Sequence, residues 1–142
     1  MEKVIIMLHL FHPLRSDYWT IKVRNFDVKR DNYYSNGVLY FNELVKVNRS
    51  LRVQLTDEEK VVLHRYMDTL PDTQEFMFGF TNSNSYTQAV RRIASGVFGE
   101  KFSINKFRHL RDFPNAVKEI YTRLNDLATS MNHTLATHVE KY

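Results

Sequence analysis

The chain has 142 residues, the length of one domain, and 43% of them are hydrophobic, which excludes a disordered tail. Its formal charge of +4 and its pI of about 9.3 permit nucleic-acid binding without proving it. The absence of cysteine excludes a disulfide framework, a thiolate zinc site and a cysteine nucleophile.

The N-terminal part of the sequence predicts a helix followed by a strand. Residues 3–11 are an apolar run that predicts a helix ending near Pro13. This run is too short to span a bilayer, and nothing after it resembles a signal-peptide cleavage site. Aromatic and β-branched residues alternate roughly over 18–28 and therefore predict a strand.

The next segment predicts a small antiparallel sheet. We expect Asp31–Gly37 to be a turn, because Asn36-Gly37 is a strong hairpin signal. Residues 38–44 then predict a second strand and residues 51–55 a third, joined by a polar connection. The sheet expected near the N-terminus therefore has three strands.

The rest of the sequence predicts helices. Thr56 and Glu59 form the sequence of a capping box, and the helix that they begin should end before Pro71. Ser83 or Ser85 is expected to cap the next helix, and Ser103 the one after it. Further helices are expected over residues 104–113, 114–131 and 134–142. The predicted fold class is α+β, mainly helical, in one domain over residues 1–142.

Several residues have the chemistry needed for phosphate transfer. Cleavage of a phosphodiester without a metal needs cations that hold the phosphate, a nucleophile, and a proton donor for the leaving oxygen. Arginine suits the first task because its planar fork meets two phosphate oxygens at once. No single residue is diagnostic in a chain with 20 Lys and Arg and 8 Tyr, so the local contexts decide.

The last residues carry the first of these contexts, MNHTLATHVEKY. This segment resembles the C-terminal signature of tyrosine recombinases, in which a Gly-His pair precedes the nucleophilic tyrosine by nine residues. His133 and Tyr142 stand nine residues apart here. Asn132 replaces the glycine, and asparagine also reaches left-handed backbone angles.

Upstream, FSINKFRHLRD resembles the second box of the family, in which His or Lys lies three residues before an Arg-His pair. Arg108 and His109 match the pair, and Asn105 stands where the family has His or Lys. This departure puts a proton relay at Asn105 in doubt, although its amide can still donate a hydrogen bond to phosphate. Arg111 offers a competing alignment.

Two more boxes precede these in the family's order. HPLRSDYW resembles the first box, with Arg15 as its arginine; where the family often has an acidic residue, the chain has Tyr18, next to Asp17. KVNRSLRVQL resembles the β-hairpin segment that carries the catalytic lysine, and Lys46 is the match.

The resemblance implies the catalytic-domain fold of tyrosine recombinases (phage-type integrases) and strand exchange through a covalent intermediate. Tyr142 would attack the scissile phosphate and form a 3′-phosphotyrosine, and Lys46 would protonate the leaving 5′-hydroxyl. Arg15 and Arg108 would clamp the non-bridging oxygens, and His133 would donate a further hydrogen bond. These residues should converge on one cationic surface, and no metal or cofactor is needed.

The resemblance also implies partners and context. The expected partner is double-stranded DNA, bound by a homo-tetramer, with a monomer possible in isolation and no membrane involved. We expect an intracellular protein of a mobile element or virus, in a prokaryotic cytoplasm or in a host nucleus or cytoplasm. The chain lacks the usual N-terminal DNA-clamping domain and a helix after Tyr142, so we expect a truncated or minimal member.

Other functions fit the same residues. A type IB topoisomerase or a telomere resolvase shares the chemistry but relaxes or seals DNA. A non-catalytic DNA-binding remnant is favoured by Asn105 and by the abrupt C-terminus. Lys46 could also be a solubilising charge at a hairpin tip, and Tyr142 a frayed last residue.

Overall fold

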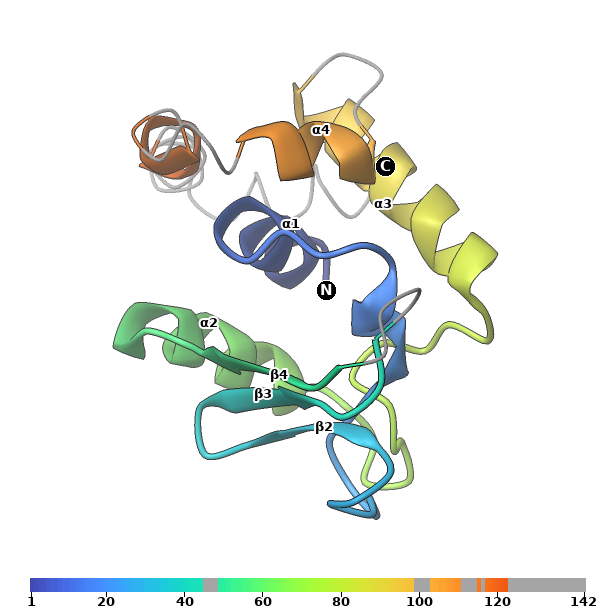
Figure 1. The fold of residues 1–142 in the computed structure, drawn as a ribbon. Coiled ribbons are helices and arrows are strands. Elements are labelled where there is room, and N and C mark those ends of the chain that lie inside the picture. Colours follow the sequence, from blue (N-terminus) through green and yellow to red (C-terminus); the bar gives the residue numbers. More distant parts are fainter. Residues whose placement is uncertain (45–48, 99–102, 111–114, 116, 123–142) are drawn as a thin grey trace. The chain divides into compact units, whose positions relative to one another are not determined.

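The computed structural model describes residues 1–44, 49–98, 103–110, 115 and 117–122. The elements, drawn in Figure 1, are α1 (Glu2–Phe11), η1 (Asp17–Thr20), β1 (Ile21–Lys22), β2 (Asn32–Ser35), β3 (Val38–Phe41), β4 (Leu51–Gln54), α2 (Asp57–Met67), α3 (Ser83–Phe98) and α4 (Ile104–Leu110). The predicted α+β class is confirmed. The chain divides into two compact units, one formed by Arg15–Tyr86 and the other by Met1–Leu14 with Thr87–Tyr142.

The sheet belongs to the unit Arg15–Tyr86 and has four strands in the order β1-β2-β3-β4. β1 runs parallel to β2, and the other neighbours are antiparallel. The prediction of three antiparallel strands was therefore wrong. The strand that was not predicted is β2, because its polar residues Asn32–Ser35 were expected to belong to a turn.

The hairpin between β2 and β3 turns at Asn36-Gly37, as predicted. Both residues have positive φ, 50° and 83°, which suits the twist of a two-residue hairpin. The prediction that all of Asp31–Gly37 forms a turn was wrong, because Asn32–Ser35 is strand β2. Asn32 and Tyr34 are buried in alternation with their neighbours, as strand geometry requires.

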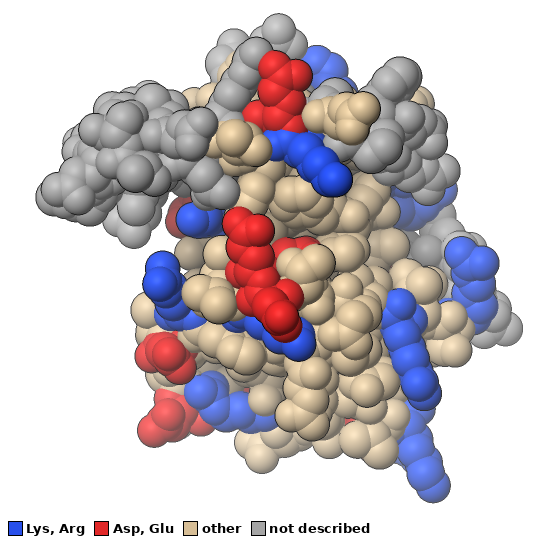
Figure 2. All heavy atoms as spheres, turned by 90° about the vertical axis from the view of Figure 1, so that its left-hand side faces the viewer, with Lys and Arg blue, Asp and Glu red and all other residues tan. Residues whose placement is uncertain are grey.

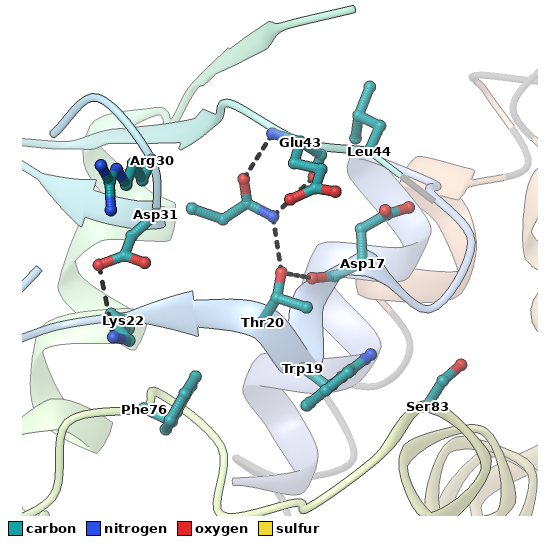
Figure 3. A pocket seen from close by; sticks show the side chains of 11 residues that line it. Asp17, Trp19, Thr20, Lys22, Arg30, Asp31, Glu43, Leu44, Phe76 and Ser83 are labelled. Carbon is teal, nitrogen blue, oxygen red and sulfur yellow. Dashed lines mark hydrogen bonds and ion pairs between the residues drawn. The ribbon is translucent and has the colours of Figure 1, made fainter. Parts of the chain in front are cut away.

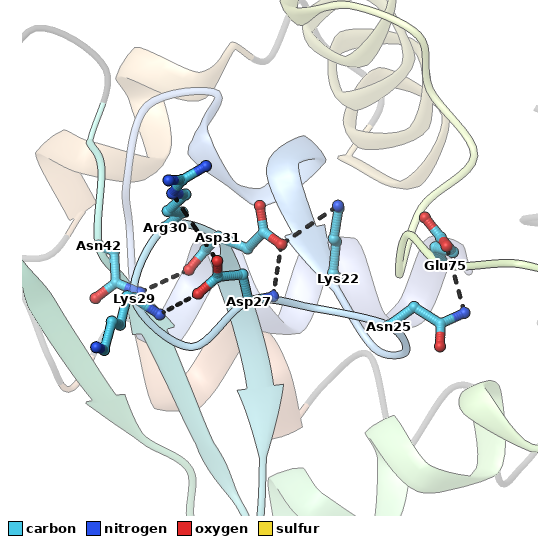
Figure 4. A network of polar contacts seen from close by, with 8 residues as sticks. All are labelled: Lys22, Asn25, Asp27, Lys29, Arg30, Asp31, Asn42 and Glu75. Carbon is cyan, nitrogen blue, oxygen red and sulfur yellow. Dashed lines mark hydrogen bonds and ion pairs between the residues drawn. The ribbon is translucent and has the colours of Figure 1, made fainter.

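The predicted strand over 18–28 was also wrong beyond its two residues in β1. Residues 17–20 form the 3-10 helix η1, and residues 27–30 are a turn. Side chains hold this turn, shown in Figure 4: the carboxylate of Asp31 accepts the N–H of Asp27 at 2.8 Å, and that of Asp27 accepts the N–H of Lys29 at 2.9 Å. Short acidic side chains that bond nearby N–H groups favour turns over strands.

An aromatic ladder crosses one face of the sheet. Tyr33 and Tyr40 are register partners on β2 and β3, and their rings stack with centroids 4.6 Å apart. Phe26 stacks on Tyr33 at 4.5 Å, and the guanidinium of Arg52 on β4 lies 5.3 Å from the centre of the Tyr40 ring. Each such contact stabilises strand pairing by about 0.5–1.5 kcal/mol, so the ladder fixes the register of β2, β3 and β4.

Helix α2 begins as the sequence predicts. Thr56 and Glu59 form both bonds of the capping box: the Thr56 hydroxyl accepts the Glu59 N–H at 3.2 Å, and the Glu59 carboxylate accepts the Thr56 N–H at 3.0 Å. The hydroxyl of Tyr34 on β2 lies 2.6 Å from the Nε2 atom of His64, so a polar contact joins α2 to the sheet.

The other unit is built around α1, whose residues Val4–Leu10 are all buried. His9 packs on Phe107 of α4 with ring centroids 5.5 Å apart, and Phe11 packs edge-on against Tyr121 at 4.8 Å. Burial lowers the pKa of His9 to about 3, so its ring stays neutral at physiological pH. No helix in the described part of the chain is long and apolar enough to cross a membrane.

The remaining caps and helices match the sequence only in part. The side-chain oxygen of Asn82 accepts the N–H of Ser85 at 2.8 Å, so Asn82 caps α3 instead of a serine. Ser103 caps α4 as predicted, with a bond of 3.4 Å from the Lys106 N–H to its hydroxyl. The residues described from 117 to 122 are helical, and the rest of the predicted helices over 114–131 and 134–142 lies outside the described residues.

Candidate functional site

Arg15 opens the unit Arg15–Tyr86 and is exposed, whereas the residues that follow it are buried. Ser16 is 7% exposed, and its hydroxyl oxygen accepts a hydrogen bond of 2.7 Å from Ser83. Asp17 is 3% exposed. The backbone directly after Arg15 is therefore anchored, while its guanidinium lies at the surface, where a phosphate could reach it.

Tyr18, at the place where the family often has an acidic residue, is a core residue. It is fully buried, and its ring meets Phe41 of β3 edge-on at 5.7 Å. Burial raises the pKa of its phenol well above the usual value, and the carboxylates of Glu59 and Asp17 raise it further. Tyr18 therefore stays protonated, and the acidic side chain nearest to Arg15 in sequence is the buried Asp17.

A buried amide, Asn32, links the segment after Arg15 to the end of β3. The Nδ2 atom of Asn32 donates to the Thr20 hydroxyl at 2.7 Å and to the Glu43 carbonyl at 2.8 Å. Its Oδ1 atom accepts the Glu43 N–H at 2.9 Å. The Thr20 hydroxyl donates in turn to the carbonyl of Asp17 at 2.6 Å, and Figure 3 shows the whole chain of bonds.

These bonds run along one wall of a pocket of about 520 Å³ within the same unit (Figure 3). Lys22 lines the pocket between the carboxylate of Asp31, at 3.3 Å, and the ring of Phe76, whose centre is 5.4 Å away. The buried Nε1 atom of Trp19 has no hydrogen-bond partner among the described residues. The pocket thus combines an unsatisfied donor with charges of both signs.

The turn at residues 27–31 flanks this pocket and is fixed from the strand side as well. The amide of Asn42 donates to the Val28 carbonyl at 2.9 Å and to the Asp31 carbonyl at 2.7 Å, and Figure 4 draws the second of these bonds. Lys29 and Arg30 are exposed on this turn, but Arg30 lies 3.9 Å from the carboxylate of Asp27. The turn is therefore rigid without being strongly basic.

Lys46 lies outside the described residues, which stop at Leu44 and resume at Arg49. Arg49 is exposed. The structure therefore describes the two ends of the segment that carries Lys46. One end is Leu44, after β3, and the other is Arg49, before β4. Glu43 and Leu44, at the first of these ends, both line the pocket.

The second box lies on α4, in the other unit. Asn105 and Arg108 are one helical turn apart, and the Nη1 atom of Arg108 lies 3.5 Å from the Oδ1 atom of Asn105, at the long limit of a hydrogen bond. Asn105 and His109 are exposed, and Arg108 is half-buried. The helix therefore brings together the two residues that the alignment pairs, while Arg111 lies outside the described residues.

His133 and Tyr142 also lie outside the described residues. Arg15 belongs to one unit, and Asn105 and Arg108 to the other. The convergence of all these side chains on one surface therefore stays a prediction.

Sequence reasoning missed Asn32 and Thr20 as parts of this site. Asn32 falls in DNYYSNG, a stretch whose composition is typical of a turn. Its role depends on the pairing of β2 with β3, which brings Glu43 beside it, and no local signal in the sequence gives that pairing.

Charge is divided unevenly along the chain. The segment Arg15–Tyr86 has ten Lys and Arg and ten Asp and Glu, whereas the other unit has ten and six. On the face drawn in Figure 2, Lys and Arg side chains lie next to Asp and Glu side chains at the left and centre, whereas along the right-hand edge only Lys and Arg are seen. Among the described residues, no three His, Asp or Glu side chains gather as a metal ion would require.

Comparisons with protein-family models, with curated proteins and with solved structures found no match to this chain.

Proposed function

We propose that this chain is the catalytic part of a tyrosine recombinase, which cuts and rejoins DNA through a 3′-phosphotyrosine. The observation that carries the proposal is the order of the four boxes, with Arg15, Lys46, Arg108 and Tyr142 in the family's sequence. Chance explains one such box easily, but it explains four in order along one domain poorly.

The geometry of the unit Arg15–Tyr86 supports this reading. The residues after Arg15 and the residues before Lys46 share one hydrogen-bonded network, through Thr20 and Asn32. Two catalytic groups far apart in sequence need such a fixed relation, because phosphoryl transfer depends mainly on the positions of the charged groups.

In the proposed reaction, the cationic surface favours loss of the Tyr142 phenol proton to water, the phenolate oxygen attacks the scissile phosphorus, and the bond to the 5′-oxygen of DNA breaks. Lys46 gives a proton to that oxygen as it leaves, and Arg15 and Arg108 balance the charge on the two non-bridging oxygens. His133 donates a hydrogen bond to the same phosphate. A 5′-hydroxyl of another strand then attacks the phosphotyrosine, the bond from phosphorus to the Tyr142 oxygen breaks, and the now neutral Lys46 takes up the hydroxyl proton, so religation needs no ATP.

Asn105 has a defined part in this scheme despite its departure from the family. Its Oδ1 atom faces the guanidinium of Arg108, which leaves the NH2 group of the amide pointing elsewhere. We infer that this NH2 group donates a hydrogen bond to phosphate beside Arg108. An amide cannot relay a proton at neutral pH, so Lys46 carries the acid role alone.

The test is capture of a covalent protein–DNA adduct, using duplex DNA of randomised sequence and denaturation with detergent. The wild-type chain should form the adduct, and Tyr142→Phe should abolish it while leaving DNA binding nearly intact. Lys46→Ala should slow cleavage by roughly two to four orders of magnitude, the usual scale for a lost general acid. The captured duplexes identify the scissile bond. A 5′-bridging sulfur at that bond should restore the cleavage rate of Lys46→Ala, because a thiolate leaves without a proton.

Asn105 also favours a second candidate, a DNA-binding remnant without activity. A remnant would bind the same duplexes but form no adduct at any enzyme concentration. A type IB topoisomerase or telomere resolvase would form the adduct. The topoisomerase would relax a supercoiled plasmid without exchanging strands, and the resolvase would seal the cut ends into hairpins.

A further inference from the structure

We propose that the outer face of the sheet binds the phosphodiester backbone of duplex DNA through the hydroxyls of Tyr33 and Tyr40 and the guanidinium of Arg52. These three residues belong to the aromatic ladder and to none of the four boxes. The inference takes duplex DNA as the partner from the function proposed above, but it does not require that the chain cleave DNA.

The two faces of the sheet differ in burial and in the side chains that they present. Tyr34, Leu39 and Val53 are buried on the inner face, where the hydroxyl of Tyr34 meets His64 of α2. Six side chains of the same strands alternate with the buried ones and form the outer face: Tyr33, Ser35, Val38, Tyr40, Arg52 and Gln54. Arg52 is the one charged side chain among these six, so no carboxylate among them competes with a phosphate for it.

The ladder covers the faces of its two tyrosine rings. The Tyr33 ring lies between Phe26, with centroids 4.5 Å apart, and Tyr40, at 4.6 Å. Because β3 lies between β2 and β4, Tyr33 and Arg52 approach the Tyr40 ring from opposite sides. A base therefore finds no open ring face on Tyr33 or Tyr40, and a ligand reaches these rings only at their edges.

The edges of this row carry hydrogen-bond donors that the described residues do not use. Side chains of a strand stand roughly perpendicular to the sheet, so two stacked rings that start on one face carry their hydroxyls to the same outer side. Within the described part of the chain, neither the Tyr33 nor the Tyr40 hydroxyl has a hydrogen-bond partner, and the Arg52 guanidinium has no carboxylate partner. Stacking at 4.6 Å and the 5.3 Å from the guanidinium to the Tyr40 ring hold the donors in one row.

A row of donors with one cation suits the backbone of DNA better than its bases. Phosphate oxygens accept hydrogen bonds from arginine and tyrosine side chains, and such contacts orient a protein on a duplex without reading its sequence. The planar fork of Arg52 can meet two phosphate oxygens at once, and the Tyr40 ring holds it in place. Single-stranded DNA fits less well, because its binding depends on bases that stack on open aromatic faces.

The test measures the affinity of the chain for a short fluorescent duplex by anisotropy at several salt concentrations. Arg52→Ala should weaken binding about 10-fold at low salt, and it should reduce the slope of log affinity against log salt by about 0.9, the value for one lost phosphate contact. The double variant Tyr33→Phe with Tyr40→Phe keeps both rings. It should weaken binding about 10-fold through its two hydroxyls with the slope unchanged, because a neutral hydroxyl releases no counterion.

Two further variants separate this surface from charge in general. Arg52→Lys keeps the charge but loses the fork, so it should keep the salt slope and lose part of the affinity. Arg65→Ala is the matched control, because Arg65 is an exposed arginine of the same unit and lies on α2, at the inner face. It should bind nearly as wild type does. Urea unfolding checks that each variant is folded, and the double phenylalanine variant decides the test if Arg52→Ala is not.

The choice of nucleic acid tests how the surface makes contact. Two duplexes of unrelated sequence should lose the same factor in affinity in each variant, because phosphate contacts carry no sequence information. A loss that appears only with single-stranded DNA would mean that bases stack on the ladder, and a loss that appears with one duplex sequence alone would mean base reading. Either result would overturn the proposal.

The outcomes also separate this surface from the recombinase. If wild type forms the covalent adduct but the ladder variants bind duplex DNA as tightly as Arg65→Ala, the surface is wrong and the recombinase stands. If the ladder variants weaken binding as stated but no adduct forms on any duplex, the surface stands and the recombinase fails. Wild type that binds no duplex at low salt would overturn both.

Discussion

Acid should destabilise the unit that contains α1 through one side chain, His9. Its pKa is lowered from 6.5 to about 3 by complete burial. Between pH 6.5 and pH 3, His9 is therefore protonated in the unfolded chain and neutral in the folded chain. Stability is complete above about pH 6.5 and is lost progressively as the pH falls from there toward 3. Between pH 7 and pH 5 the loss is about 2 kcal/mol, or about 30-fold in the ratio of folded to unfolded protein.

Urea unfolding at pH 7 and at pH 5 measures this effect. The leucine in His9→Leu has a similar volume and cannot titrate. From pH 7 to pH 5, wild type should therefore lose about 2 kcal/mol more of its free energy of unfolding than His9→Leu does. His109→Gln is the matched control, because His109 lies on α4 but is exposed, and it should keep the wild-type sensitivity. Equal losses in wild type and His9→Leu would refute the assignment, because the acid sensitivity would then come from other groups.

Three further predictions concern the sheet and DNA. Gly37→Ala should lower the free energy of unfolding by about 1–2 kcal/mol, because Gly37 has a φ of 83° and an added Cβ would meet the side chain of Lys60; urea titration measures this. Arg52→Ala should cost about 0.5–1 kcal/mol through loss of its contact with the Tyr40 ring, whereas Arg52→Lys should keep part of it. DNA binding should weaken steeply with salt, and an affinity that stays flat from low to physiological salt would contradict contacts with phosphate.

The sequence predicted those elements whose signals are local. The capping box at Thr56 and the turn at Asn36-Gly37 each depend on residues within a few positions, and both are present. The length of β1 and the existence of β2 were mispredicted because they depend on strands elsewhere in the chain. β1 has two residues and depends on its pairing with β2, and the polar stretch of β2 is a strand because β3 lies beside it. Local composition carries no information about such partners.

In the candidate site, too, contacts between residues close in sequence were predictable and contacts between distant residues were not. Arg108 and Asn105 are three residues apart on one helix, so the sequence alone predicts that they are neighbours, and they are. Asn32 could not be found in this way. Its partners, Thr20 and Glu43, are 12 and 11 residues away along the chain, and only the folded sheet brings them together. A local motif therefore identifies residues that are neighbours on one helix, and it does not identify contacts that depend on the pairing of strands.

The uneven charge suggests that the two units contribute differently to DNA binding. The segment Arg15–Tyr86 has equal numbers of acidic and basic residues, so at long range it neither attracts nor repels a phosphate backbone strongly. The whole excess of positive charge belongs to the other unit, where Arg91 and Arg92 are exposed on α3 and Arg108 lies on α4. On the proposed function, that unit would supply most of the attraction for DNA. Arg15, whose following backbone is anchored, would then act at short range on a phosphate that the other unit has attracted.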